Sequence, residues 1–572
     1  MIDYKKLIAA EIFDEALGLT EEQIAEMIEI PVDTTMGDYA FPCFRLAKTM
    51  RKAPQLIAQE VASRIEGCEI FDHVEQVNAY VNIFIRKEYF MEHLLKDVAE
   101  QGADYGRSDR GAGRTVIVEY SSPNIAKPFH IGHIRSTVIG NAIYKIFDAQ
   151  GYHVIRINHL GDYGTQFGKM IVAYRKWGSE EELEKEPIKS LLRYYTKFHE
   201  EAEKDPSLND EARKAFYNLE HGEAEETALW KRFRELSLSE FNRVYDMLDI
   251  TFDSYAGESF YSDKMPAVLQ ELKDKNLLVE SQGAQIVDLE PYGMAPALIT
   301  KSDGTSLYVT RDIAAAIYRK EHYDFDKCIY VVASQQNLHF RQWKKVLELM
   351  GYEWQEDCIH VPFGLVSLEE GTMSTRKGRV VFLEDVLNKA VEKTAEIIRE
   401  KNTDGIDVDE IAKEVGIGAV IFQELSNNRI KDYTFSWDKV LNFDGETGPY
   451  VQYTHVRACS VLRSASEEDL KAVAEQQIAD YGYLTSESAY TLAKLIYRMP
   501  EVISEAADKY EPSILTRHLV DIAQEFNKFY HDEHILVENA DERVAKLALV
   551  SAARTAIANA LNLLNMKAPE RM

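Results

Sequence analysis

Two histidines and a lysine lie within one short segment and are the residues best suited to chemistry on a phosphate. His130 and His133 flank Gly132, and Lys127 precedes the group by three residues. Imidazole and ammonium groups beside a helix N-terminus stabilise negative charge that grows on a phosphate. Gly132 lacks a Cβ, so a nucleotide can approach the backbone closely. Taken alone, the spacing is more often a chance pair or half of a metal site, and the surrounding elements decide.

The sequence around these residues predicts a strand, a loop and a helix. Residues 115–120 are apolar and β-branched, as in a buried parallel strand. Residues 121–129 form a polar loop with two prolines, which do not suit a helix interior. From Ile134 the apolar residues recur at helical spacing, and Gly151 is the expected end of this helix. Residues 153–158 are predicted to form a second strand. The loop of such a βαβ unit binds phosphate-bearing ligands at the helix N-terminus.

This segment resembles the first signature of class I aminoacyl-tRNA synthetases. The longer string EYSSPNIAKPFHIGH, residues 119–133, resembles arginyl-tRNA synthetases in particular. The resemblance extends over the whole chain in the expected order. It implies that His130, Gly132 and His133 bind ATP, and that Lys127 and both histidines act on its phosphates.

A second signature departs from the family pattern. Residues 371–379, GTMSTRKGR, resemble the KMSKS loop, but Thr372 and Thr375 stand where the two lysines belong. Such a departure is common among arginyl enzymes, and the resemblance implies that a neighbouring cation, or Lys127 from the other side, replaces the second lysine. Which cation does so stays open. The residues of this loop that the resemblance assigns to ATP or to catalysis are Met373, Ser374, Arg376 and Lys377.

Recognition of arginine requires carboxylates. A guanidinium presents five donors in a planar fork and is always charged, so a buried site needs acids in matching geometry. The resemblance assigns this role to Glu119 and Asp312, which fall at or just beyond predicted strand ends. The alternatives are that Asp312 only caps a predicted helix and that Glu119 pairs with Arg135. The other residues that the resemblance places around arginine are Ser122, Asn124, His133, Tyr308 and Gln336.

The elements in chain order predict three domains. Residues 1–105 are predicted to form an N-terminal α+β module. This module resembles the family's additional domain, which contacts the tRNA D-loop. Residues 106–404 read as an α/β catalytic domain with a doubly wound, Rossmann-type parallel sheet. A helical and acidic insertion at about 166–260 interrupts it. Residues 405–572 read as an all-α bundle, similar to the family's anticodon-binding domain.

The N-terminal module contains predicted helices at residues 4–17 and 54–66 and a predicted strand at residues 74–86. The resemblance implies that Tyr80 and Asn82 bind tRNA, since an aromatic ring stacks on an unpaired base and an amide reads its edge. The alternative is that Tyr80 belongs to the apolar face of an amphipathic strand.

The C-terminal bundle has a predicted helix from Pro449 and a final helix at residues 542–564. The resemblance implies that Tyr530 and Met572, and less securely Tyr453, contact the anticodon. Aromatic residues at helical spacing are usually core residues instead.

Composition sets the limits on these interpretations. The net charge of −29 disfavours non-specific nucleic-acid binding, including DNA, so RNA must bind through local basic patches. Five scattered cysteines without a CxxC pair argue against zinc and against disulfides, and indicate the cytoplasm. No apolar run predicts a membrane span, and acids within residues 1–18 argue against a signal peptide. The expected substrates are L-arginine, tRNA-Arg and ATP with Mg²⁺, without a dedicated metal site.

Two other phosphate-binding motifs are excluded by their glycine spacing. Residues 164–170 lack the glycine spacing of a P-loop, and residues 111–113 lack the third glycine of a dinucleotide fingerprint. A synthetase for another amino acid, a small-molecule nucleotidyltransferase and a catalytically dead paralogue that binds RNA or a partner are the competing classes. The paired acids argue against the first, the flanking domains against the second, and the intact histidine pair against the third. The resemblance also suggests that activation waits for tRNA.

Overall fold

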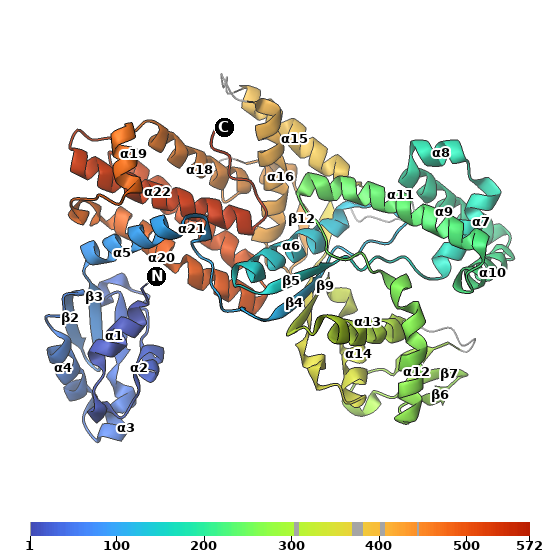
Figure 1. Ribbon diagram of the computed structural model, residues 1–572, viewed down its shortest axis with the longest axis horizontal. Helices are drawn as coiled ribbons and strands as arrows, with labels where there is room; N and C mark the ends of the chain where they lie inside the picture. Colours follow the sequence, from blue (N-terminus) through green and yellow to red (C-terminus); the bar gives the residue numbers. More distant parts are fainter. Residues whose placement is uncertain (1, 302–307, 369–380, 401–406, 443–444) are drawn as a thin grey trace. The chain divides into compact units, whose positions relative to one another are not determined.

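The computed structural model describes residues 2–301, 308–368, 381–400, 407–442 and 445–572 (Figure 1). The chain forms two compact units. One comprises residues 1–105, 457–499 and 521–559, and the other comprises residues 106–456, 500–520 and 560–572.

The larger unit is built on a four-stranded parallel sheet in the order β10-β9-β4-β5. Its strands are β4 (Thr115–Glu119), β5 (His153–Ile157), β9 (Lys327–Ala333) and β10 (Cys358–Phe363). Helix α6 (Ile134–Ala149) connects β4 to β5, and α14 (Asn337–Leu349) connects β9 to β10. These two crossovers leave the β4–β9 pair in opposite directions, so the carboxyl ends of β4 and β9 form the switch point of a doubly wound sheet. The predicted fold class is confirmed.

The alternation of side chains along β4 determines which helix covers which face. Val116, Ile117 and Val118 are all fully buried, as expected for a central parallel strand. Ile117 packs in one cluster with Ile313 of α13 (Tyr308–Tyr323) and Trp343 of α14. Successive side chains of a strand point to opposite faces, so residues 117 and 119 face α13 and α14, whereas Val116 and Val118 face the other side.

Helix α6 approaches the sheet closely because of one glycine. A Cβ at Gly140 would lie 2.1 Å from Cβ of Tyr120. Gly151, the expected helix terminator, has a φ of 81° and follows α6 at once. The helix that carries the histidine pair at its start is therefore held against the end of β4.

The remaining elements of the larger unit are mostly helical. The predicted insertion is confirmed as helices, and a small antiparallel sheet of β6, β7 and β8 that the sequence pattern did not reveal follows it. Two short parallel strands, β11 and β12, enclose α15 and α16 in sequence. The bounds are α7 (Thr165–Trp177), α8 (Glu180–Lys185), α9 (Pro187–Lys204), α10 (Leu208–Glu220), α11 (Ala224–Leu248), α12 (Met265–Asp274), β6 (Val279–Ser281), β7 (Ala284–Val287), β8 (Ala297–Thr300), β11 (Val366–Leu368), α15 (Leu383–Glu400), α16 (Val408–Ser426), β12 (Tyr433–Phe435) and α17 (Trp437–Val440).

The smaller unit contains a three-stranded antiparallel sheet in the order β1-β3-β2. The prediction of one strand over residues 74–86 is wrong. The chain turns back at Asn78, whose φ of 54° lies in the left-handed region that asparagine tolerates in tight turns. The N-terminal elements are α1 (Tyr4–Ile12), α2 (Glu21–Met27), β1 (Tyr39–Pro42), α3 (Ala47–Met50), α4 (Pro54–Ile65), β2 (Phe71–Val77), β3 (Tyr80–Ile85) and α5 (Lys87–Gln101).

The C-terminal part is helical, as predicted. One of its helices, α22, has the length and hydropathy of a membrane span, but 72% of its most apolar window is buried inside the protein, as in a core helix. The helices are α18 (Gly448–Arg463), α19 (Glu467–Ala474), α20 (Glu487–Lys509), α21 (Ser513–Asp532) and α22 (Ala540–Leu563).

Replacement of Gly140 by alanine tests the close approach of α6 to β4. Because the new methyl group meets Tyr120, α6 must move outward, and we expect the thermal midpoint to fall by the equivalent of about 1–3 kcal/mol. Differential scanning calorimetry measures this loss. An unchanged midpoint would contradict the packing described above.

Candidate active site

The first signature lies at the sheet's switch point. Residues 120–133 continue from the carboxyl end of β4, and a short 3-10 helix, Ser334–Gln336, follows the neighbouring strand β9. Ser121 and Ser122 have φ values of 68° and 47°, which L-residues rarely adopt. Strained backbone of this kind persists where the surrounding structure enforces it, and it is enriched at ligand sites.

The two histidines contact each other through the backbone at the start of α6. Nδ1 of His130 accepts a hydrogen bond from the Gly132 amide at 3.1 Å. Nδ1 of His133 accepts one from the His130 amide at 3.1 Å. The ring centroids lie 4.0 Å apart. A neutral imidazole that accepts at Nδ1 carries its proton on Nε2, so each ring has one N–H donor left for a ligand.

Burial determines the charge of this pair. Burial, and then the charge of Lys127, lowers the pKa of His130 to about 4. Burial, and then the neighbouring His130, lowers the pKa of His133 well below its usual value. Both rings are therefore neutral at pH 7, and the positive charge beside them comes from Lys127. The Lys127 ammonium lies 5.9 Å from the centroid of the Tyr195 ring.

The chain that follows the second signature is hydrogen-bonded to the first. The Ile131 amide donates to the Val381 carbonyl at 3.1 Å, and the Leu383 amide donates to the Phe129 carbonyl at 3.0 Å. His130 and Phe382 form the bridge between these two bonds. The predicted residues of the second signature, Met373, Ser374, Arg376 and Lys377, lie outside the described residues, and their roles stay predictions.

Glu119 is bound to a cation other than the one considered from the sequence. Its Oε2 lies 2.6 Å from Nη1 of Arg319, and the two side chains are 9% and 0% exposed. The alternative that Glu119 pairs with Arg135 is wrong, because Glu119 faces α13, which carries Arg319, and Arg135 belongs to α6 on the other side of the sheet. The Arg319 guanidinium also lies over the rings of Tyr261 and Tyr330.

Asp312 is likewise bound to a basic side chain. It forms a short contact with Nε2 of His339, the third residue of α14. Burial lowers the pKa of His339, but the hydrogen bond and charge of Asp312 outweigh this and raise it overall. The alternative that Asp312 caps a helix is wrong, because α13 already begins at Tyr308.

The other residues predicted around arginine lie at the start of α13, on the 3-10 helix after β9 and on the loop after β4. Tyr308 is 60% exposed, and its ring centroid lies 5.6 Å from Cζ of Arg311. Gln336 is exposed at the end of the 3-10 helix that follows β9. Asn124 forms a β-bridge with Gly161, where a Cβ would lie 2.3 Å from the amide oxygen of Asn124. Ser122 is half-buried.

The sequence reasoning missed Arg319 and His339. A signal for Arg319 existed, because it follows Asp312 by seven residues and therefore lies on the same face of α13. No local pattern links His339 to Asp312, since they belong to different helices.

The residues predicted to contact tRNA differ in exposure. Tyr80 is half-buried, and its ring lies 5.6 Å from that of Phe44, which is 44% exposed. Asn82 is only 2% exposed, so its amide cannot reach a base in this conformation. Tyr453 and Tyr530 are 40% and 42% exposed, so neither is a core residue.

Met572 is half-buried at the end of the chain. The cysteines are all free thiols. No group of three or more His, Cys, Asp or Glu suited to a metal ion occurs within the described part of the chain.

Comparisons with known proteins cover the chain from end to end. Residues 95–437 match the family described as tRNA synthetases class I (R), catalytic domain. Residues 451–572 match the DALR anticodon binding domain, and residues 3–85 match the arginyl tRNA synthetase N terminal domain.

Individual proteins give the same result. The arginine–tRNA ligases of Clostridioides difficile and Halothermothrix orenii are 60% and 58% identical to this chain over 572 residues, which is 100% of each protein. The arginyl-tRNA synthetase of Thermus thermophilus superposes with a TM-score of 0.79 at 25% identity, covering 100% of both chains. That of Plasmodium falciparum, at 24% identity, shares the fold with a TM-score of 0.80 and covers 99% of this chain and 98% of its own. The chain belongs to the class I arginyl-tRNA synthetases.

Proposed function

We propose that this protein activates L-arginine with ATP and transfers it to tRNA-Arg, and that the switch point of the sheet carries both steps. The observation that supports this most directly is the convergence at one sheet edge of a neutral histidine pair, Lys127 and two carboxylates. Full-length relatives give the alternative of a catalytically dead paralogue no support.

In the first step, a carboxylate oxygen of arginine attacks the α-phosphorus of ATP. A new P–O bond forms, the bond to the β-phosphate oxygen breaks, and pyrophosphate leaves, with Mg²⁺ bound to ATP as part of the substrate. Such a reaction needs positioning and charge stabilisation more than covalent help. The Nε2–H groups of His130 and His133 donate to phosphate oxygens, and the Lys127 ammonium offsets the growing charge.

Arginine is held by the two acids on the α13 side of the sheet. Glu119 shares one oxygen with Arg319, which keeps the carboxylate oriented and leaves its second oxygen for the substrate guanidinium. The substrate competes with His339 for Asp312. A lysine substrate lacks the planar fork and would leave acceptors unpaired, which sites of this kind reject by roughly four orders of magnitude.

In the second step, a hydroxyl of the terminal tRNA ribose attacks the arginyl carbonyl, and AMP leaves. Tyr80 in the N-terminal module and Tyr453, Tyr530 and Met572 in the helical part are the proposed tRNA contacts. Tyr530 has the Arg457 guanidinium 5.1 Å from its ring centroid, so that a positive charge accompanies this exposed aromatic surface. The buried Asn82 is left out of this proposal.

The proposed domains are residues 1–105, 106–404 and 405–572, whereas the three family matches cover residues 3–85, 95–437 and 451–572. The proposed location is the cytoplasm, where its tRNA and ATP are found. The relatives are ligases of translation, and the five free thiols are compatible with a reducing compartment.

Arginine-dependent exchange of pyrophosphate into ATP tests the first step. We expect exchange with tRNA-Arg present and none without it, because the resemblance implies that activation waits for tRNA. Exchange without tRNA would refute that coupling alone. Silence under both conditions, with folded protein and cognate tRNA, would refute the proposed function.

Replacement of the arginine-binding acids tests the recognition site. Glu119→Gln and Asp312→Asn each remove a charged acceptor, so we expect the KM for arginine to rise about 10- to 100-fold. Asp326→Asn is the matched control, because Asp326 accepts from the Thr115 amide at the opposite end of β4. A KM for arginine that stays at the wild-type value in Glu119→Gln would remove Glu119 from the site.

Acidification tests the neutral state of the histidine pair. The folded-state pKa of His130 is about 4, below its value of about 6.5 in the unfolded chain. The unfolded state therefore binds protons first, and stability falls as the pH drops from about 6.5 toward 4. We expect His130→Gln to lose less thermal stability than the wild type between pH 7 and pH 5. Parallel curves for the two proteins would show that His130 is not held neutral.

A further inference from the structure

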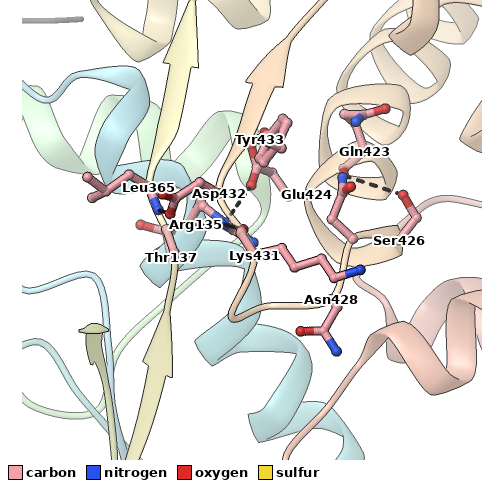
Figure 2. Close-up of polar contacts among 12 residues, drawn as sticks. Arg135, Thr137, Leu365, Gln423, Glu424, Ser426, Asn428, Lys431, Asp432 and Tyr433 are labelled. Atoms are coloured by element: carbon pink, nitrogen blue, oxygen red, sulfur yellow. Dashed lines mark hydrogen bonds and ion pairs between the residues drawn. The ribbon is translucent and has the colours of Figure 1, made fainter. Parts of the chain in front are cut away.

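One buried arginine connects the start of α6 to a second part of the same unit. Arg135 follows His133 by two residues and is 0% exposed. Its Nη1 donates to the Gly364 carbonyl at 2.9 Å and to the Lys431 carbonyl at 2.8 Å. Figure 2 shows the Arg135 side chain beside Leu365 and Lys431, between the two chain segments that it joins.

These two carbonyls precede the paired strands β11 and β12. Val366 of β11 pairs with Tyr433 of β12 in parallel. The segments approach closely at Gly364, where a Cβ would lie 2.6 Å from Oδ1 of Asp432. The Arg135 guanidinium therefore fixes the start of this strand pair relative to the first turn of α6.

The Arg135 guanidinium is itself held by groups from α16 and β12. Its Nε lies 3.4 Å from Oε2 of Glu424, and both side chains are 0% exposed. The Tyr433 hydroxyl donates to the other carboxyl oxygen of Glu424, and Cζ of Arg135 lies 5.2 Å from the Tyr433 ring centroid. Burial raises the pKa of Glu424 to about 8, against the lowering effect of Arg135.

Stability alone does not explain this arrangement. Nη2 of Arg135 and Oε2 of Glu424 have no hydrogen-bond partner among the residues that the structure describes. Burial of a guanidinium and a carboxyl group with unsatisfied atoms costs desolvation energy, and apolar side chains of similar volume are often as stable or more so. A function that needs a fixed distance between elements is a better reason for the pair.

The elements that Arg135 connects carry the two signatures. The histidine pair lies directly before Arg135, and β11 ends at Leu368, where the described chain stops before residues 369–380. The described chain on the far side, at Val381 and Leu383, is bonded to Ile131 and Phe129. The backbone bonds of Ile131 and Leu383 link the first signature to the chain that follows the KMSKS-like loop. Arg135 adds a link to the chain that precedes this loop.

We propose that Arg135 is a positioning residue for arginine activation, which sets β11 at a fixed distance from His130 and His133, while Glu424 and Tyr433 hold its guanidinium in place. The proposal depends on the proposed function. Misplacement of reacting groups by about 1 Å can lower a rate about 100-fold without loss of substrate binding. The effect belongs to turnover, because Arg135 and the arginine-binding acids lie on opposite faces of the sheet.

Arg135→Lys tests this role in tRNA-supported pyrophosphate exchange. Lysine keeps the charge but cannot span two carbonyls and a carboxylate from one planar group. We expect kcat to fall about 10- to 100-fold, with the KM for arginine changed less than about 2-fold. A KM for arginine that rises as much as kcat falls would overturn the proposal.

Arg429→Lys is the matched control. Arg429 donates to the Pro362 carbonyl at 2.9 Å and to the Tyr510 carbonyl at 3.0 Å, so its side-chain hydrogen bonds support the same stretch of chain and go to residues outside α6. We expect a lower thermal midpoint with kcat close to the wild-type value. Equal losses of kcat in Arg429→Lys and Arg135→Lys would show that Arg135 only supports the structure, and would overturn the proposal.

Glu424→Gln keeps the test decisive if Arg135→Lys does not fold. The amide keeps one oxygen for the Tyr433 hydroxyl and replaces the oxygen that faces Nε of Arg135 by an NH2 group, so we expect a smaller loss of kcat in the same direction, again at constant KM for arginine. Wild-type kcat in Glu424→Gln would overturn the role of Glu424. Absence of exchange in the wild-type protein would refute the proposed function. That outcome differs from failure of the Arg135 proposal, in which the wild type is active and the variants show the wrong pattern.

Discussion

The divergence of the two crossovers from the β4–β9 pair is the constraint on which the rest of the site depends. Because α6 leaves β4 toward β5 and α14 leaves β9 toward β10, neither of these two crossovers covers the carboxyl ends of the two central strands. Groups from both faces of the sheet reach this edge. The histidines proposed to bind phosphate lie just before α6, whereas the acids proposed to bind arginine lie on the side of the sheet that α13 and α14 cover.

Buried charge pairs then place these groups. Glu119 is held by Arg319 on one face of the sheet, and Arg135 is held by Glu424 on the other. Such pairs contribute little net stability, since desolvation offsets much of the attraction. These pairs fix the positions of the side chains instead, because a buried polar group with few partners has few favourable positions. Burial also restricts the two histidines, because it keeps both rings neutral and leaves each of them one N–H donor with a fixed direction.

Local patterns recovered most of the fold, and errors arose where tertiary contacts decide. The strand at residues 115–120, the helix from Ile134 and the helical insertion were predicted from apolar spacing alone. The predicted strand at residues 74–86 failed because a turn at Asn78 interrupts an otherwise continuous β pattern. The small sheet of β6 to β8 escaped because its strands are three or four residues long, too short for a periodic signal.

The family, the fold class and the identity of the chemical groups could be predicted from the amino-acid sequence, because they follow from motifs and from periodicity along one chain. Which charged side chains meet depends on the tertiary structure. Glu119 pairs with Arg319 and Asp312 with His339, whereas Arg135 turns to Glu424, 289 residues further along the chain. Pairing across elements depends on which face of the sheet a side chain occupies and on what packs against that face, and neither is written in the spacing of neighbouring residues.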